Sequence, residues 1–257
     1  MMDRKIGAQL YTVRDFCQTE KDLSETFAKL KEIGYQRVQI SGVDESMPAK
    51  SIKAIADEYG MDIACTHRPL TEFTDSLDEL IKFHQELDCT VAGLGMMPKE
   101  NYFDLDLIKG FIKTMKPIVN TLKENGMCFG YHNHAYEFAK LGGKQIMDIL
   151  LEETDPEAFC FIPDTHWIAF AGVNPADCIR KMGKRAKVVH FKDLKMVDWL
   201  QTDYAEVLEG NLDFDSIIKA CDDAGAMCAV VEQDFCPGDP FDSLKISYDN
   251  LKTKGFR

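Results

Sequence analysis

Short apolar runs alternate with amphipathic segments along almost the whole chain. The apolar runs are continuous rather than interrupted by polar residues, which is typical of strands in a parallel sheet buried on both faces. The segments between them carry apolar residues at helical spacing and often begin at Pro or end at Gly, which predicts helices. The expected strands are 5–12, 37–40, 61–66, 89–94, the first part of 128–138, 159–163, 186–189 and 226–231. The expected helices are 23–33, 48–59, 77–84, 103–124, 146–151, 175–182, 211–224 and 241–251, and Pro117 is expected to kink or divide the fourth of them.

This order of elements predicts the fold class. Eight strands and eight helices, at spacings that suit βαβ crossovers, favour an α/β protein built as a single (β/α)8 TIM barrel of residues 1–257. A doubly wound open sheet is the competing architecture, but no Gly-x-Gly-x-x-Gly follows the first strand. Segment 192–210 is expected to be the longest loop, and long loops after barrel strands cover the end where the chemistry lies.

Composition and charge narrow the classes of partner. The 30 basic and 43 acidic residues give a formal net charge of −13, which opposes binding to nucleic acid or to an anionic membrane. No apolar run reaches the length of a membrane span, and no signal-peptide core follows the first residues. The 9 cysteines are scattered without a Cys-x-x-Cys pair, and several lie in apolar runs as small hydrophobic residues. We therefore expect a reduced, cytoplasmic protein.

The stretch 128–138 holds the densest group of candidate chemistry, because it contains His132, His134 and Glu137. In a strand, the two histidines point to the same face, since side chains alternate with a period of two. Paired imidazoles beside a carboxylate indicate a metal or acid–base site. The alternative is an aromatic-rich strand end with two solvated histidines, and this stretch alone leaves both interpretations open.

Three later strands also end in residues that can bind a metal. The sixth, seventh and eighth expected strands are followed directly by Asp164, His190 and Glu232. Each also has a structural explanation when taken alone. Asp164 can cap a turn, His190 can be a core histidine whose hydrogen bonds are satisfied, and Glu232 can pair with a nearby cation. Because the carboxyl ends of barrel strands converge on one face, their recurrence at the same position favours a shared site.

Together with Glu137, these residues make an oxygen-rich donor set of three carboxylates and one imidazole. Such a set favours one divalent ion, Mn²⁺, Mg²⁺ or Co²⁺, and leaves Zn²⁺ open. Without a thiolate ligand, the ion is expected to be catalytic. It can hold a carbonyl and a neighbouring hydroxyl oxygen and so acidify the proton on the carbon between them. Carboxylates on both sides can then remove and return that proton.

Six motifs along the chain form one ordered set: Gly7-Ala8-Gln9-Leu10-Tyr11-Thr12-Val13-Arg14-Asp15, Tyr131-His132-Asn133-His134-Ala135-Tyr136-Glu137-Phe138, Pro163-Asp164-Thr165-His166-Trp167, His190-Phe191-Lys192-Asp193, Gly210-Asn211-Leu212-Asp213 and Val231-Glu232-Gln233-Asp234. In this order they resemble the motifs of the xylose isomerase-like sugar isomerase and epimerase barrels. The resemblance spans essentially the whole chain. It implies a divalent metal held by Glu137, Asp164, His190 and Glu232. It also implies proton transfer through an enediolate-like intermediate on a keto sugar, with Glu137 and Glu232 as catalytic groups.

One triplet departs from the family pattern. Many members carry Glu-Asn-His at the end of the fifth strand, where this chain has His132-Asn133-His134. The role of that carboxylate is then assigned to Glu137 further along the loop, or His132 is itself the catalytic base. A histidine base suits the dehydratase and keto-glycoside-cleaving members. A lyase acting on inososes or 3-keto-glycosides is therefore the alternative to an isomerase or epimerase.

Four further residues, His67, His134, Trp167 and Lys192, are expected to bind the substrate. An indole can stack on a sugar ring, and a lysine can bind a substrate oxygen. His84, inside an expected helix, is interpreted as structural.

The expected partner is a small sugar, and barrels of this type often pair as homo-oligomers. A DNA-repair endonuclease on the same barrel is opposed by the net charge of −13, and a non-catalytic sugar-binding protein is the remaining alternative.

Overall fold

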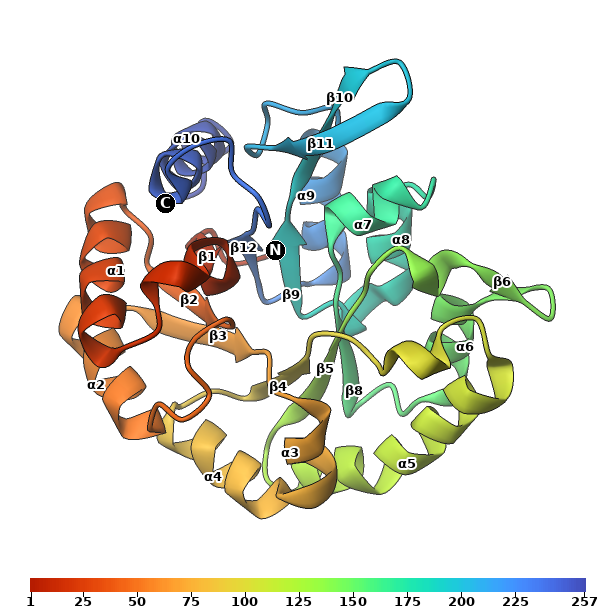
Figure 1. The fold of residues 1–257 in the computed structure, drawn as a ribbon. Coiled ribbons are helices and arrows are strands. Elements are labelled where there is room, and N and C mark those ends of the chain that lie inside the picture. The colour runs from red at the N-terminus through yellow and green to blue at the C-terminus, as the bar shows by residue number, and fades with distance from the viewer.

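Eight parallel strands form a barrel, and Figure 1 looks down into it. The computed structural model describes residues 1–257. The barrel strands are β1 (Gly7–Gln9), β2 (Arg37–Ile40), β3 (Asp62–Thr66), β4 (Val91–Leu94), β5 (Cys128–His132), β8 (Phe159–Ile162), β9 (Val188–Phe191) and β12 (Cys228–Val231). Ladders join β3-β2-β1-β12-β9 and β4-β5-β8. A bridge between Asp164 and His190 links the β8 and β9 sides, and the backbone N–H of Arg68 donates to the carbonyl of Gly93 between the β3 and β4 sides. The (β/α)8 prediction is confirmed.

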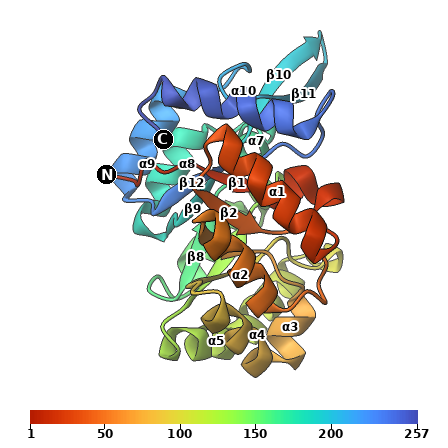
Figure 2. The same cartoon turned by 90° about the vertical axis from the view of Figure 1, so that its left-hand side faces the viewer.

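Helices surround the barrel on its outside, as the view turned by 90° also shows (Figure 2). They are α1 (Glu20–Ile33), α2 (Ala49–Tyr59), α3 (Leu70–Asp75), α4 (Leu77–Glu86), α5 (Leu105–Glu124), α6 (Ile146–Glu153), α7 (Thr165–Phe170), α8 (Pro175–Met182), α9 (Phe214–Ala224) and α10 (Pro240–Lys252). The eight helices expected from sequence are all present, and α3 and α7 are short additions. Side-chain caps begin several of them; for example, Thr19 accepts from the N–H of Asp22 at the start of α1. None of the helices is both long and apolar enough to cross a membrane.

The hydrophobic core has two parts. The larger part holds 68 buried residues and includes the apolar faces of the helices. A separate cluster of 8 residues comes mostly from alternate positions of the barrel strands, as expected of side chains that point into a barrel. Its members are Ala64, Cys65, Val91, Cys160, Ile162, Val188, Cys228 and Val230. The inside of the barrel is therefore filled by side chains over part of its height.

Segment 192–210, expected to be a loop, instead contains an antiparallel hairpin of β10 (Asp193–Asp198) and β11 (Gln201–Ala205). The hairpin projects from the barrel (Figure 1). Trp199 and Leu200 form its tip and are exposed. Polar and apolar residues alternate only over 193–196, and no Gly-containing turn marks the connection, so the sequence gives little indication of a hairpin. A second, smaller hairpin pairs β6 (Lys140–Leu141) with β7 (Lys144–Gln145).

Pro117 does not divide the long helix, because α5 is continuous from Leu105 to Glu124. Buried apolar residues lie on both sides of the proline, among them Met115 and Ile118, and their packing holds the two halves together. The first strand also differs from expectation. It ends at Gln9 and continues as a 3-10 helix, Leu10–Phe16, which begins with the Gln9 side chain accepting from the N–H of Tyr11.

Candidate active site

Four side chains from four neighbouring strands meet at the carboxyl end of the barrel. His132 ends β5, Asp164 follows β8, His190 lies in β9 and Glu232 follows β12. One ligand-type atom of each lies within 4.8 Å of the others, and all four residues are buried. His190 Nδ1 lies 2.8 Å from Glu232 Oε2 and 3.8 Å from Asp164 Oδ2, while His132 Nε2 lies 3.4 Å from Asp164 Oδ2. The structure thus brings Asp164, His190 and Glu232 together, as the strand-end pattern predicts.

The buried ammonium of Lys192 neutralises part of this cluster. Its Nζ lies 2.7 Å from Asp234 Oδ2, 3.3 Å from Glu232 Oε2 and 3.4 Å from Asp164 Oδ2. Burial raises the pKa of the Asp164 and Glu232 carboxyl groups, but the positive charge of Lys192 together with the interactions with His132 and His190 outweighs it, so that both pKa values lie below their usual range. Burial likewise lowers the pKa of Lys192, and the three carboxylates more than reverse that effect. Both cluster carboxylates are therefore ionised at neutral pH.

The four residues fit a divalent cation. Two ionised carboxylates and two imidazoles are a common donor set for such an ion, and their ligand atoms already lie close together. Burial lowers the pKa of His190, whereas the charge of Glu232 and hydrogen bonds to Asp164 and Glu232 raise it to about 9. A histidine held as a cation by two carboxylates occupies a place where positive charge is strongly favoured, which is what a metal site requires.

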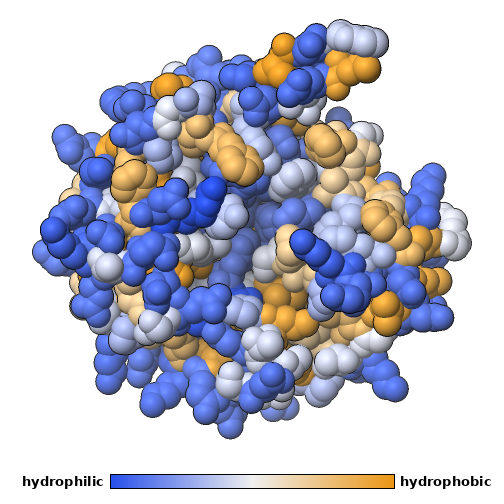
Figure 3. All heavy atoms as spheres, viewed as in Figure 1, coloured by the Kyte–Doolittle hydropathy of each residue, from blue (hydrophilic) through white to orange (hydrophobic).

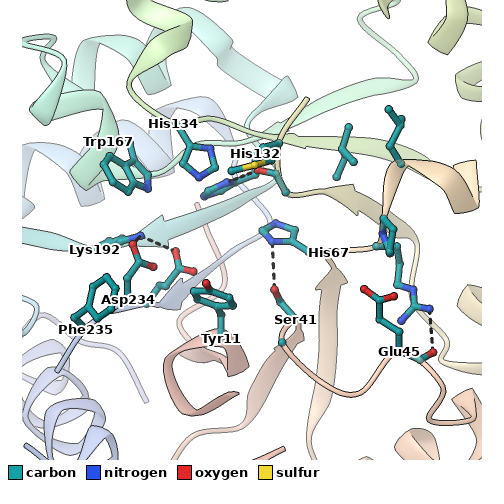
Figure 4. A pocket seen from close by; sticks show the side chains of 18 of the residues that line it. Tyr11, Ser41, Glu45, His67, His132, His134, Trp167, Lys192, Asp234 and Phe235 are labelled. Atoms are coloured by element: carbon teal, nitrogen blue, oxygen red, sulfur yellow. Dashed lines mark hydrogen bonds and ion pairs between the residues drawn. The ribbon is translucent and has the colours of Figure 1, made fainter. Parts of the chain in front are cut away.

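A cavity of about 750 Å³ opens over the cluster. The space-filling view shows this hollow at the centre of the barrel face, with hydrophilic residues deep inside it (Figure 3). All four residues predicted to bind substrate, His67, His134, Trp167 and Lys192, line the cavity (Figure 4). The other lining residues are Tyr11, Ser41, Gly42, Glu45, Arg68, Pro69, Leu70, Leu94, Gly95, Met96, His132, Tyr204, Glu232, Asp234 and Phe235.

Two cavity histidines present nitrogen atoms that have no partner in the protein. The His67 ring lies 5.0 Å from the His132 ring and 5.6 Å from the His190 ring, and its buried Nε2 is unpartnered. The buried Nδ1 of His134 is unpartnered too. Burial, reinforced by the neighbouring His132, lowers the pKa of His67 well below its usual value and that of His134 to about 3. Both rings are neutral and offer polar atoms to a ligand in the cavity.

Aromatic rings form one wall of the cavity beside Lys192. Lys192 Nζ lies 5.1 Å from the centre of the Trp167 ring and 5.4 Å from that of Tyr204 in β11. His166, the residue before Trp167, turns away from the cluster: its ring stacks on Tyr204 at 4.6 Å, and its Nδ1 hydrogen-bonds to the carbonyl of Asp193. Tyr204 was not expected at the site, because it lies in the hairpin strand β11, in a segment that was expected to be a loop.

The expectation that Glu137 is the metal ligand of the fifth strand needs correction, because Glu137 is not a member of the cluster. A short 3-10 helix, Tyr136–Phe138, turns its carboxylate back toward the strand. There it accepts hydrogen bonds from the Tyr131 hydroxyl at 2.7 Å and from the backbone N–H of His134 at 2.8 Å. Burial raises the pKa of Glu137 to about 7. Glu137 thus anchors the loop that carries His134, and His132 takes the place next to Asp164.

Two buried polar side chains hold the strand ends in place. Asn133 Oδ1 accepts from the backbone N–H of Asp164 at 3.1 Å, which ties the end of β5 to the end of β8. Asp193 accepts four backbone N–H bonds, from Leu194, Leu208, Gly210 and Leu212, and so fastens the hairpin and its return loop. A Cβ at position 210 would overlap the Asp193 carboxylate, so only glycine fits there. These contacts explain the Asn133 and Gly210 motif positions, for which sequence suggested no role.

Comparisons with known proteins extend this description. The chain is 29% identical to an inosose dehydratase of Geobacillus thermodenitrificans over 136 residues, which are 46% of this chain and 45% of that protein. It is 26% identical to an inosose dehydratase of Clostridium perfringens over 151 residues, 51% of this chain and 50% of that protein. The matched region thus spans about half the length of these curated relatives.

Solved structures with the same fold match nearly the whole chain. A sugar phosphate isomerase/epimerase from Parabacteroides distasonis superposes with a TM-score of 0.79 at 22% identity, covering 98% of this chain and 94% of that one. A probable 3-DHS dehydratase from Bacillus anthracis superposes with a TM-score of 0.74 at 15% identity, covering 96% and 98%. The model of the family described as xylose isomerase-like TIM barrel matches residues 27–252. The chain therefore belongs to the xylose isomerase-like TIM barrel family, as its motifs suggested.

Proposed function

We propose that this protein uses a divalent metal ion to remove a proton from the carbon next to a carbonyl in a sugar or sugar derivative. The observation that carries the proposal is the meeting of His132, Asp164, His190 and Glu232 beside a cavity that His132 and Glu232 line. These four residues would hold the ion, and two imidazoles beside two carboxylates favour Mn²⁺, Co²⁺ or Zn²⁺ over Mg²⁺. When bound there, the ion supplies Lewis acidity to a carbonyl and a neighbouring hydroxyl oxygen.

Glu232 is the residue we propose as the base. Its contacts with His190 and Lys192 both involve Oε2, so Oε1 is left for a substrate in the cavity that Glu232 lines. Both nitrogens of His132 have partners, because Nδ1 hydrogen-bonds to the carbonyl of Gly95 at 3.0 Å and Nε2 faces Asp164. His132 is therefore better suited to be a ligand than the base.

His67 and His134 are the groups we propose to exchange protons with substrate oxygens. Each is neutral and has a buried nitrogen without a protein partner at the cavity. Loss of a hydroxyl group requires a proton at the departing oxygen, and a neutral imidazole that donates a hydrogen bond can supply it. Trp167 offers its ring for stacking against the substrate, as expected from sequence.

The position of Glu137 favours elimination over return of the proton. Epimerisation needs a second base opposite the first, and the carboxylate that would supply it from the fifth strand is turned away toward Tyr131. Both curated relatives are inosose dehydratases, which supports elimination of water as the reaction. We therefore propose dehydration of a keto-polyol such as an inosose, and cleavage of a 3-keto-glycoside is the same elimination with a different leaving group. Isomerisation or epimerisation of a keto sugar is the second candidate, supported by His67 and His134 as alternative proton donors.

The charges in the cavity favour an unphosphorylated substrate. Lys192 is already paired with three carboxylates. Arg68, the other lining cation, pairs with Glu72 through two hydrogen bonds. No cation of the cavity lining is left free to neutralise a phosphate.

Incubation of the Mn²⁺- or Co²⁺-loaded protein with a keto-inositol and, separately, with ketohexoses in D₂O tests this proposal. Mass spectrometry and proton NMR distinguish a product lighter by one water from a product that has only gained deuterium. We expect loss of water from the keto-inositol, and neither change after chelation or in Glu232→Gln. Deuterium incorporation without loss of water would instead establish the epimerase candidate. Absence of both reactions with every metal and substrate would contradict the proposed function.

A further inference from the structure

Gln39 is a polar residue inside the barrel whose presence packing does not explain. It lies in β2, and it is fully buried. Its Oε1 lies 2.8 Å from His190 Nε2, while its amide nitrogen has no partner. The contact with His190 is therefore the only side-chain hydrogen bond of Gln39. A buried amide left half-paired is less favourable than an apolar side chain of similar shape, so the glutamine has a role other than stability.

The contact with Gln39 determines which nitrogen of a neutral His190 carries the proton. A neutral imidazole carries one N–H and one lone pair. Binding a cation requires His190 to lose one of its two ring protons; when Nε2–H donates to Gln39 Oε1, the proton that leaves is the one on Nδ1, whose lone pair then points toward Glu232 and Asp164. The opposite tautomer would turn an N–H toward the position of the cation. Ligating histidines are commonly fixed by an acceptor for the other ring nitrogen.

We propose that Gln39 is a positioning residue that sets the tautomer of His190 and thereby the affinity of the cluster for a divalent cation. This inference rests on the metal-dependent function proposed above. It adds a residue from β2, on the far side of the barrel from the cluster residues of β5 and β8. Gln39 acts through His190 and contributes no atom to the cluster.

Gln9 is a matched control for this role. It lies opposite Gln39 in the ladder between β1 and β2, it is fully buried, and its amide nitrogen is also unpartnered. Its Oε1, however, accepts from the backbone N–H of Tyr11 at 3.1 Å rather than from His190. The same substitution at the two positions therefore separates loss of a buried amide from loss of the contact with His190.

The test measures Co²⁺ binding to the full chain by isothermal titration calorimetry at one fixed pH. Gln39→Met removes the acceptor at similar length, and we expect it to weaken Co²⁺ binding by about 10- to 100-fold. Gln9→Met should stay within about 3-fold of the unsubstituted protein, as should Gln39→Glu, which keeps an acceptor for Nε2–H. Proton–nitrogen NMR of histidine-labelled protein loaded with Zn²⁺ should show Nε2 protonated and Nδ1 bound in the unsubstituted protein, and lose that single signature in Gln39→Met.

Unchanged Co²⁺ binding in Gln39→Met, or equal weakening in Gln9→Met, would overturn the inference while leaving the proposed function intact. Failure of the unsubstituted protein to bind any divalent cation would overturn both. Should Gln39→Met fail to fold, Gln39→Asn keeps a polar amide but withdraws the acceptor by one methylene. It is then expected to show the same weakening, and normal binding by Gln39→Asn would overturn the inference.

Discussion

The inside of the barrel has an apolar half and a charged half, and the same strands build both. On β8 the inward-facing Ile162 is followed two residues later by Asp164, and on β12 the inward-facing Val230 is followed by Glu232. Since inward positions recur at every second residue, a single step along each strand separates packing from chemistry. The apolar half requires only volume and shape. The charged half holds ionised groups because each lies against an opposite charge, chiefly that of Lys192.

With the proposed function, stability and chemistry would be assigned to neighbouring layers of one barrel. Substitutions in the charged half should change catalysis and metal binding more than folding. Substitutions in the apolar half should do the reverse.

The largest effect is expected from Glu232→Gln. Losing the base and one ligand together should lower kcat by about 1,000-fold or more, while circular dichroism shows an intact fold. Steady-state assays with the keto-inositol measure this. Retention of more than a tenth of the activity would show that Glu232 is not the base.

Ile162→Ala, in the apolar half, is expected to lower stability rather than catalysis or metal binding. The cavity left inside the barrel should lower the free energy of unfolding by about 2–5 kcal/mol. Urea unfolding measures this change, and Co²⁺ titration of the still-folded variant should give the affinity of the unsubstituted protein. A loss of metal affinity as large as that in Glu232→Gln would break the proposed separation of the two halves.

His84 should give a pH-dependent effect of intermediate size far from the charged half. It is fully buried, and its nitrogens bond to the Leu80 carbonyl and the Thr66 hydroxyl, so the structural role expected from sequence fits these contacts. Burial lowers the pKa of His84 to about 4, below its ordinary value of 6.5. Its contribution to stability is therefore complete above pH 6.5 and is lost as the pH falls toward 4.

The difference between the unsubstituted protein and His84→Gln isolates this contribution. Between pH 7.5 and pH 4.5, the unsubstituted protein should lose about 2–3 kcal/mol more unfolding free energy than the variant. Urea unfolding at the two pH values provides the measurement. Equal losses in the two proteins would mean that His84 is not held neutral by its surroundings.

The smallest effect on the metal is expected from Glu137→Gln. Because Glu137 bonds to Tyr131 and to the backbone of His134 rather than to the cluster, the affinity for Co²⁺ should change by less than about 3-fold. Activity should fall more than affinity, since the loop that carries His134 loses part of its anchor. A loss of Co²⁺ binding comparable to that of an Asp164→Asn variant would restore Glu137 as a ligand.

Sequence patterns predicted the barrel and most of the cluster because both follow from strand periodicity. Asp164, His190 and Glu232 lie at equivalent strand ends, so their meeting follows from the fold. Glu137 was misassigned because it lies beyond the strand, where a 3-10 turn rather than a fixed period decides where a side chain points. Gln39 was missed although it gave a signal, since polar residues at positions 37 and 39 alternate within an otherwise apolar strand.

The hairpin was missed for a different reason. Its two strands pair only with each other, and their position depends on the Asp193 carboxylate gathering backbone N–H groups from the return loop. Such long-range hydrogen bonds leave no periodic trace in the sequence. The aromatic wall that Tyr204 contributes to the cavity could therefore be found only from the structure.

The most direct test of the central claim is a crystal structure of the protein grown with Mn²⁺, with anomalous difference density measured for the metal. The account predicts one strong peak ligated by His132, Asp164, His190 and Glu232, with Glu137 still bonded to Tyr131. A peak elsewhere, a peak ligated by Glu137 in place of His132, or no peak at all at saturating Mn²⁺ would contradict it.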